Sequence, residues 1–136
     1  MKKGFFIILI LVVYMHGCEK DNKSQDEFPS PPVGLSHWPV SGITGPATAT
    51  VNQMLTLEIT YPTSSGCDYI SEFQTVFSTN IVLVKAFGSS FDDTPCTQAA
   101  IPKKIKFNYI PTTQGAYIFK FINPDNSIII YNLSVF

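Results

Sequence analysis

The chain has 136 residues, of which 45% are hydrophobic and 14% are charged, a balance typical of one folded domain and not of a disordered chain. The formal net charge is −1, and all nine basic residues are lysines. Because arginine supplies the planar bidentate donor that phosphate groups favour, and because the lysines form no long basic run, we expect no nucleic-acid partner.

The amino terminus has the pattern of an export signal. Lys2 and Lys3 precede an apolar stretch at residues 5–15, which is shorter than the roughly 20 residues that a bilayer-spanning helix needs. Residues 15–18, Met-His-Gly-Cys, place a small residue directly before Cys18 and resemble the lipobox of bacterial lipoproteins. This resemblance implies that residues 1–17 are a removable lipoprotein signal peptide and that lipid on Cys18 anchors the protein in a membrane. The alternative is an ordinary secreted protein with a free cysteine near its start.

Residues 18–39 are expected to form a flexible tether that begins at the lipidated cysteine. Residues 19–32 are polar, charged and proline-bearing, with no hydrophobic period. The acidic patch at residues 24–27, Ser-Gln-Asp-Glu, resembles the short export signals of surface lipoproteins in the Bacteroidetes, although acidic tethers also occur for solubility alone. Trp38 is either an exposed aromatic contact for a ligand or, the interpretation we favour, a plug over the open end of the domain.

Residues 40–136 are expected to form the folded domain. They show the period-two alternation of β-strands, interrupted by Pro, Gly, Asn and Asp, and no sustained helical period. Residues 80–87 are almost continuously apolar, which predicts a central strand covered on both faces. A long loop is expected at residues 88–102. The pattern predicts seven strands, at residues 43–51, 54–61, 69–77, 80–87, 105–109, 117–121 and 127–136.

The organising stretch is at residues 105–121, where two runs with aromatic faces flank a Pro/Gly corner and are expected to form a hairpin. Gly115, Tyr117 and Phe119 have a spacing that resembles the tyrosine corner of immunoglobulin-like sandwiches. The expected fold class is therefore all-β, an immunoglobulin-like antiparallel β-sandwich of about seven strands. The alternative is another Greek-key sandwich or barrel.

Together with the lipobox, this pattern resembles the small immunoglobulin-like lipoproteins of the Bacteroidetes. The resemblance implies a lipid-anchored location in the bacterial cell envelope, at the outer membrane, and leaves open which membrane face carries the protein.

Cys67 and Cys96 form an even pair in a chain with an export signal, which favours a disulfide between them. The alternative is a redox or metal-binding thiol pair, but the sequence has no Cys-x-x-Cys motif and no histidine near either cysteine. A bridge would tie the loop at residues 88–102 to the turn before Tyr69, and would so create a rigid end of the sandwich built from loops.

The sequence offers no catalytic set. Once the signal peptide is removed, His37 is the only histidine, and it lies beside Pro39 at the end of the tether, where a preorganised general base is not expected. Glu58 and Glu72 alternate with apolar strand residues and are expected to point into solvent, not toward each other. We therefore expect a protein that is not an enzyme.

No metal or cofactor is expected either. Asp68, Asp92 and Asp93 could approach one another if the disulfide forms, and calcium favours such carboxylate oxygens. Acidic loop residues are, however, more often simply solvated.

The function we expect is that of a binding or structural module for a protein or carbohydrate partner. Aromatic and small polar residues on a rigid loop suit such recognition. The candidate binding residues are Asp68, Tyr69, Phe91, Asp92 and Asp93. The alternatives are a periplasmic enzyme inhibitor, a small enzyme of unknown class, or a spacer without a ligand; the oligomeric state is open.

Overall fold

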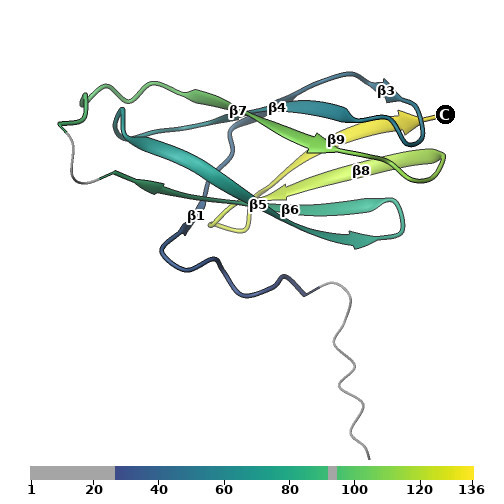
Figure 1. Cartoon of the computed structure of the whole chain (residues 1–136), viewed down its shortest axis with the longest axis horizontal. Helices are drawn as coiled ribbons and strands as arrows, with labels where there is room; N and C mark the ends of the chain where they lie inside the picture. The colour runs from purple at the N-terminus through teal and green to yellow at the C-terminus, as the bar shows by residue number, and fades with distance from the viewer. Residues whose placement is uncertain (1–26, 92–94) are drawn as a thin grey trace, which may run out of the picture.

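A computed structural model describes residues 27–91 and 95–136 of the chain. The expected lipidation site Cys18, the signal peptide and the candidate residues Asp92 and Asp93 lie outside the described residues. In the described part, nine β-strands form two sheets that pack face to face as an immunoglobulin-like β-sandwich (Figure 1). These residues contain no helix, and so none that is long and apolar enough to cross a membrane.

The larger sheet, sheet A, has six strands, and the smaller, sheet B, has three. Sheet A contains β1 (Ser36–Trp38), β3 (Thr48–Ala49), β5 (Asp68–Ser78), β6 (Ile81–Ser90), β8 (Gly115–Ile122) and β9 (Ile128–Val135). Sheet B contains β2 (Gly42–Thr44), β4 (Leu55–Tyr61) and β7 (Lys103–Tyr109). The fold class predicted from the sequence is therefore confirmed.

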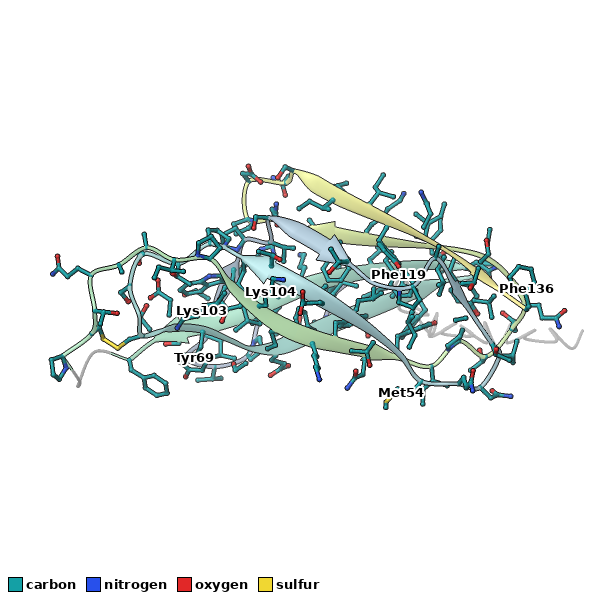
Figure 2. The ribbon with its side chains drawn as sticks, turned by 90° about the horizontal axis from the view of Figure 1, so that it is seen from above. Met54, Tyr69, Lys103, Lys104, Phe119 and Phe136 are labelled. Carbon is teal, nitrogen blue, oxygen red and sulfur yellow. A yellow bond between two sulfur atoms is a disulfide. The ribbon has the colours of Figure 1, made fainter. Side chains whose placement is uncertain are left out.

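The core lies between the sheets and is rich in aromatic rings. Strand alternation directs Leu57 and Ile59 of β4 inward, where both are 0% exposed. Phe119 of β8 is also fully buried and lies in the middle of the sandwich (Figure 2). Phe107 of β7 packs edge-to-face against Phe119 and Phe121, with ring centroids 6.3 and 5.6 Å apart, which is a favoured arrangement of aromatic pairs.

The predicted hairpin at residues 105–121 is wrong, because β7 and β8 belong to different sheets. β7 pairs with β4 in sheet B, whereas β8 pairs with β6 and β9 in sheet A. The aromatic faces of the two strands meet across the core, as they could not if the strands lay side by side in one sheet. The residues between them cross from one sheet to the other, held in part by a hydrogen bond from Asn52 N to the buried Pro111 O at 2.8 Å.

Tyr117 forms the predicted tyrosine corner at the start of β8. Its side chain is 2% exposed, and its hydroxyl accepts a hydrogen bond from Thr113 N at 3.3 Å and lies 2.8 Å from Thr113 Oγ1. Gly115 enters the strand with a φ of +134°, which disfavours residues with a side chain, and a Cβ there would lie 2.7 Å from Asn80 Nδ2. The glycine and the tyrosine together fix where the chain joins sheet A.

The strand count and directions differ from the prediction. The single edge strand expected at residues 43–51 is divided at Gly45-Pro46 into β2, which pairs with β4, and β3, which pairs with β9 in the other sheet. Proline lacks the N–H that a continuous ladder needs, so the chain changes sheets there. β3 runs parallel to β9, and β6 runs parallel to β8, although the sequence predicted antiparallel pairing throughout.

The folded part begins earlier than the predicted boundary between residues 39 and 40. Ser36–Trp38 pairs with β6 as β1, so the end of the expected flexible tether is a strand of sheet A. Trp38 packs against the core, and its Nε1 donates a hydrogen bond to Pro62 O at 3.2 Å. This arrangement agrees with the plug that we favoured for Trp38.

The hydrogen bond at the Tyr117 corner is expected to contribute to the free energy of unfolding. Replacing Tyr117 with Phe should lower the free energy of unfolding by about 1–2 kcal/mol, because Thr113 N–H loses its partner in a partly buried turn. Urea unfolding measures the change. Tyr69→Phe is the control, since the structure records no hydrogen bond of the Tyr69 hydroxyl among the described residues, and it should change stability much less. Equal losses in both variants would show that the corner hydrogen bond adds nothing.

Candidate functional site

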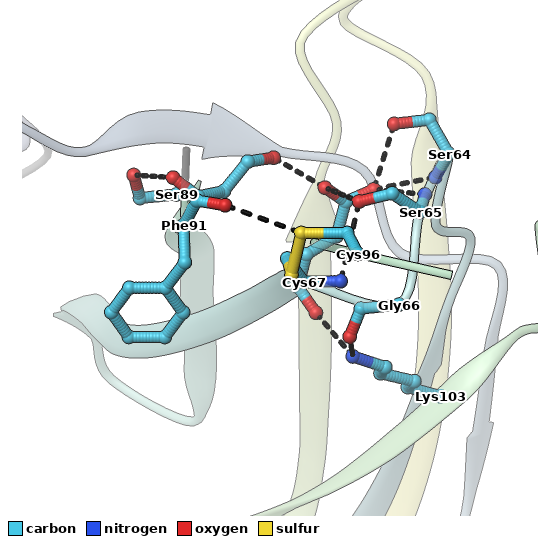
Figure 3. Close-up of a disulfide and its surroundings, with 10 residues drawn as sticks. Ser64, Ser65, Gly66, Cys67, Ser89, Phe91, Cys96 and Lys103 are labelled. Atoms are coloured by element: carbon cyan, nitrogen blue, oxygen red, sulfur yellow. Dashed lines mark hydrogen bonds between the residues drawn. A yellow bond between two sulfur atoms is a disulfide. The ribbon is translucent and has the colours of Figure 1, made fainter. Parts of the chain in front are cut away.

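The predicted disulfide between Cys67 and Cys96 is present and closes one end of the sandwich (Figure 3). The two Cα atoms are 5.5 Å apart, and the bridge spans 29 residues of sequence. By the chain-entropy estimate, such a loop closure stabilises the fold by about 3.5 kcal/mol. Beside it, Gly66 N donates a hydrogen bond to Thr97 O at 2.8 Å, which joins the two backbones. A Cβ on Gly66 would lie 2.2 Å from the side-chain Oγ1 of Thr97.

Asp68, a candidate contact residue, is fully buried, and its carboxylate accepts hydrogen bonds from its own turn and from Ser90 of β6. Oδ2 accepts hydrogen bonds from Ser64 N, Ser64 Oγ and Ser65 N at 2.5, 2.8 and 3.0 Å. Oδ1 accepts from Ser65 Oγ at 3.0 Å and from Ser90 Oγ. The hydrogen bond from Ser90, followed by those from Ser64 and Ser65, lowers the pKa of this carboxyl well below its ordinary 3.8 against the opposing effect of burial. The carboxylate therefore holds the turn in shape.

Lys103 ties the same turn to sheet B, a role that the sequence analysis missed. Its Nζ donates hydrogen bonds to Gly66 O at 2.6 Å and to Asp68 O at 2.7 Å (Figure 3). The Ser-Ser-Gly-Cys-Asp run could have predicted a side-chain-capped turn, because Ser and Asp bond nearby backbone groups. Nothing in the local sequence pairs that turn with Lys103, which is 35 residues from Asp68.

The exposed feature of this end is a pair of stacked rings. Tyr69 and Phe91 lie with centroids 4.5 Å apart and planes at 12°, and Phe91 is 58% exposed. Phe91 O lies 3.3 Å from Cys96 Sγ, so the residue that carries the exposed ring also contacts the disulfide. Figure 2 shows Tyr69 near the disulfide and Met54 and Phe136 toward the other end of the sandwich. Of the five candidate binding residues, the structure brings Tyr69 and Phe91 into contact at the surface.

A groove of about 410 Å³ adjoins the Asp68 turn. Trp38 and Pro62 give it an apolar wall, and Ser64 and Asp68 belong both to this groove and to the capped turn. The groove is lined by Ser36, His37, Trp38, Pro39, Pro62, Thr63, Ser64 and Asp68. We define the disulfide-clamped end as the turn at residues 64–68 with Tyr69, Phe91, Cys96 and this groove. It offers two apolar surfaces next to one turn, the ring pair and the wall of the groove.

The carboxylates of the described strands do not gather into a site. Glu58 lies 2.7 Å from Lys104 Nζ in an exposed ion pair, and Glu72 is exposed on β5. Among residues 27–91 and 95–136, no group of three or more His, Cys, Asp or Glu side chains is placed to hold a metal ion. The calcium hypothesis also included Asp92 and Asp93, which lie outside these ranges.

Comparison of the chain with protein-family models, with curated proteins and with solved structures found no match.

The contribution of the buried Asp68 carboxylate to the free energy of unfolding is expected to depend on pH. Asp68→Asn should lower the free energy of unfolding at neutral pH by about 2–3 kcal/mol, because the amide presents an NH₂ group to serine donors. The folded pKa is depressed, so the contribution is fully present above the unfolded pKa and is lost as the pH falls through the folded value. The difference between wild type and variant should therefore shrink in acid.

Urea unfolding at neutral pH and at about pH 3 measures that difference. Asp125→Asn is the matched control, because Asp125 also accepts from a nearby serine, Ser127 Oγ at 2.6 Å, but in an exposed turn. Its effect should be much smaller. A loss in Asp68→Asn that was the same at both pH values would contradict the role of the charge.

Proposed function

We propose that this protein is a lipid-anchored, non-enzymatic module of the bacterial cell envelope that binds a protein or carbohydrate partner through its disulfide-clamped end. Lipid on Cys18 holds it in a membrane, the outer membrane by resemblance to the small immunoglobulin-like lipoproteins of the Bacteroidetes. Support for the anchor comes from the lipobox-like residues 15–18 after an apolar stretch that is short for a bilayer span.

The observation that carries the binding proposal is the exposed ring of Phe91 stacked on Tyr69 beside the disulfide. An aromatic ring gives a large contact area and has few rotatable bonds to immobilise, so its binding costs little conformational entropy. The disulfide, the Asp68 turn and Lys103 already fix the backbone around the ring pair, which reduces that cost further. Such a platform suits stacking on a sugar ring or packing against an apolar peptide side chain.

A rigid disulfide-clamped end also fits the second candidate function, an inhibitor of a periplasmic enzyme. The two functions differ in the partner and not in the surface, so one set of variants tests both. A capture experiment identifies the partner, and an assay of the captured enzyme, if there is one, decides between a binding module and an inhibitor.

The surface is tested by partner capture with the purified, disulfide-bonded protein. We expect Phe91→Ala to reduce retention of envelope proteins or of glycans on an array at least several-fold, because it removes the exposed half of the ring pair. The matched control is Met54→Ala, which removes a side chain of similar exposure, 66% against 58%, toward the other end of the sandwich. If neither variant changes any retained partner, the disulfide-clamped end is not the binding surface.

The anchor is tested by replacing Cys18 with Ser. We expect the wild-type chain to incorporate radiolabelled palmitate and to sediment with membranes, and the variant to do neither while retaining the Cys67–Cys96 disulfide. Several acyl chains on one cysteine anchor stably, whereas one chain alone binds marginally. Incorporation of label by the variant would place the lipid elsewhere, and its absence in both proteins would contradict lipidation.

A further inference from the structure

The outward face of sheet A carries an apolar surface with lysines in it. Strand alternation turns Ile81 and Leu83 of β6 to this face, opposite the buried Val82 and Val84. The pairing registers arrange the outward residues in rows across β6, β8 and β9. The rows are Ile81, Ile118 and Asn132; Leu83, Lys120 and Ile130; and, at the end of β8 and β9, Ile122 and Ile128. We call these residues, with Lys85, the outer face of sheet A.

This face is exposed where it lies on β9. Ile128 and Ile130 are 51% and 57% exposed, which is more than strand residues covered by a second layer would be. On β6, β8 and β9 the sheet carries two lysines, Lys85 and Lys120, and no acidic residue; the exposed Glu72 lies on β5, opposite Phe87 of β6. At the surface of a bilayer, exposed isoleucines can contact the acyl chains, and lysines beside them can contact the anionic headgroups.

The chain approaches the domain on the same face. Gln74 Nε2 donates a hydrogen bond to Ser30 O at 3.0 Å, and Lys85 Nζ lies 4.4 Å from the centroid of the Phe28 ring. His37 stacks on Phe87 at 5.5 Å and its Nε2 donates to Ile122 O at 2.8 Å. Figure 1 shows the segment before β1 leaving the sandwich on the side of β6, away from β4 and β7.

We propose that the outer face of sheet A rests on the lipid bilayer, with Ile128 and Ile130 at the acyl-chain boundary and Lys85 and Lys120 at the phosphates. This inference depends on the proposed lipid anchor at Cys18. Nine residue steps separate Cys18 from Glu27, and a fully extended chain of that length reaches about 30 Å. The anchor thus holds the domain close to the membrane, and the face that receives the chain is the face turned toward it.

The test uses the full-length lipidated protein in vesicles of phosphatidylethanolamine and phosphatidylglycerol that contain nitroxide-labelled acyl chains. A single pyrene is attached through Asn132→Cys, an exposed position on the outer face of sheet A. The matched control is Thr44→Cys, an exposed position on the outward face of sheet B. The nitroxides should quench the pyrene at position 132 several-fold more than the pyrene at position 44.

A second pair of variants separates the face from the anchor. Ile128→Ser with Ile130→Ser should abolish the extra quenching at position 132, while Met54→Ser with Ile110→Ser, which removes exposed apolar side chains elsewhere, should preserve it. Flotation with the vesicles measures attachment through the lipid anchor, independently of the quenching. Protein that floats but shows equal or no quenching at both positions overturns this inference and leaves the anchor intact.

Three other outcomes also overturn it. Failure of the protein to float removes the lipid anchor, and with it the basis of this inference. Excimer emission from the pyrene at position 132 would show that a second copy of the chain covers the face instead of lipid, and retention of the extra quenching in Ile128→Ser with Ile130→Ser would show that the isoleucines do not make the contact.

Discussion

The packing of aromatic rings between β7 and β8 is the contact on which the sandwich depends. Phe107 comes from sheet B, and Phe119 and Phe121 come from sheet A, so the three rings join the layers at the middle of the core. Burying these rings requires that successive strands lie opposite each other and not side by side. The short crossing between them, with Gly115 and the Tyr117 corner, is a consequence of that requirement.

The disulfide-clamped end is organised by a different kind of interaction. A buried carboxylate, Asp68, accepts from serine side chains and backbone, and Lys103 bonds the same turn from the opposite sheet. The disulfide then fixes the segment after Phe91 to this turn. Polar groups, and not core packing, therefore determine where the exposed aromatic pair stands, which is why the end is rigid although it is made largely of loop.

The two proposed contacts use different surfaces of the sandwich. The proposed partner site is at one end, at Phe91 and the neighbouring groove, whereas the proposed membrane contact is a sheet face that bears Ile128 and Ile130. A domain that lay on a bilayer through the sheet face would keep its clamped end accessible from the side. The substitutions that test the proposed anchor, membrane contact and partner site therefore fall on different residues.

The fold class, most strand positions, the Cys67–Cys96 pair and the Tyr117 corner could be predicted from the sequence, because these depend on period-two alternation, cysteine parity and local spacing. The folded structure was needed to show that β7 and β8 lie in different sheets, that β6 runs parallel to β8, and that Asp68 is buried. Alternation shows which side chains of a strand turn inward but not which strand lies beside it. The sequence could not predict the burial of Asp68, because one of its donors, Ser90, is 22 residues away and reaches it only once β5 and β6 pair.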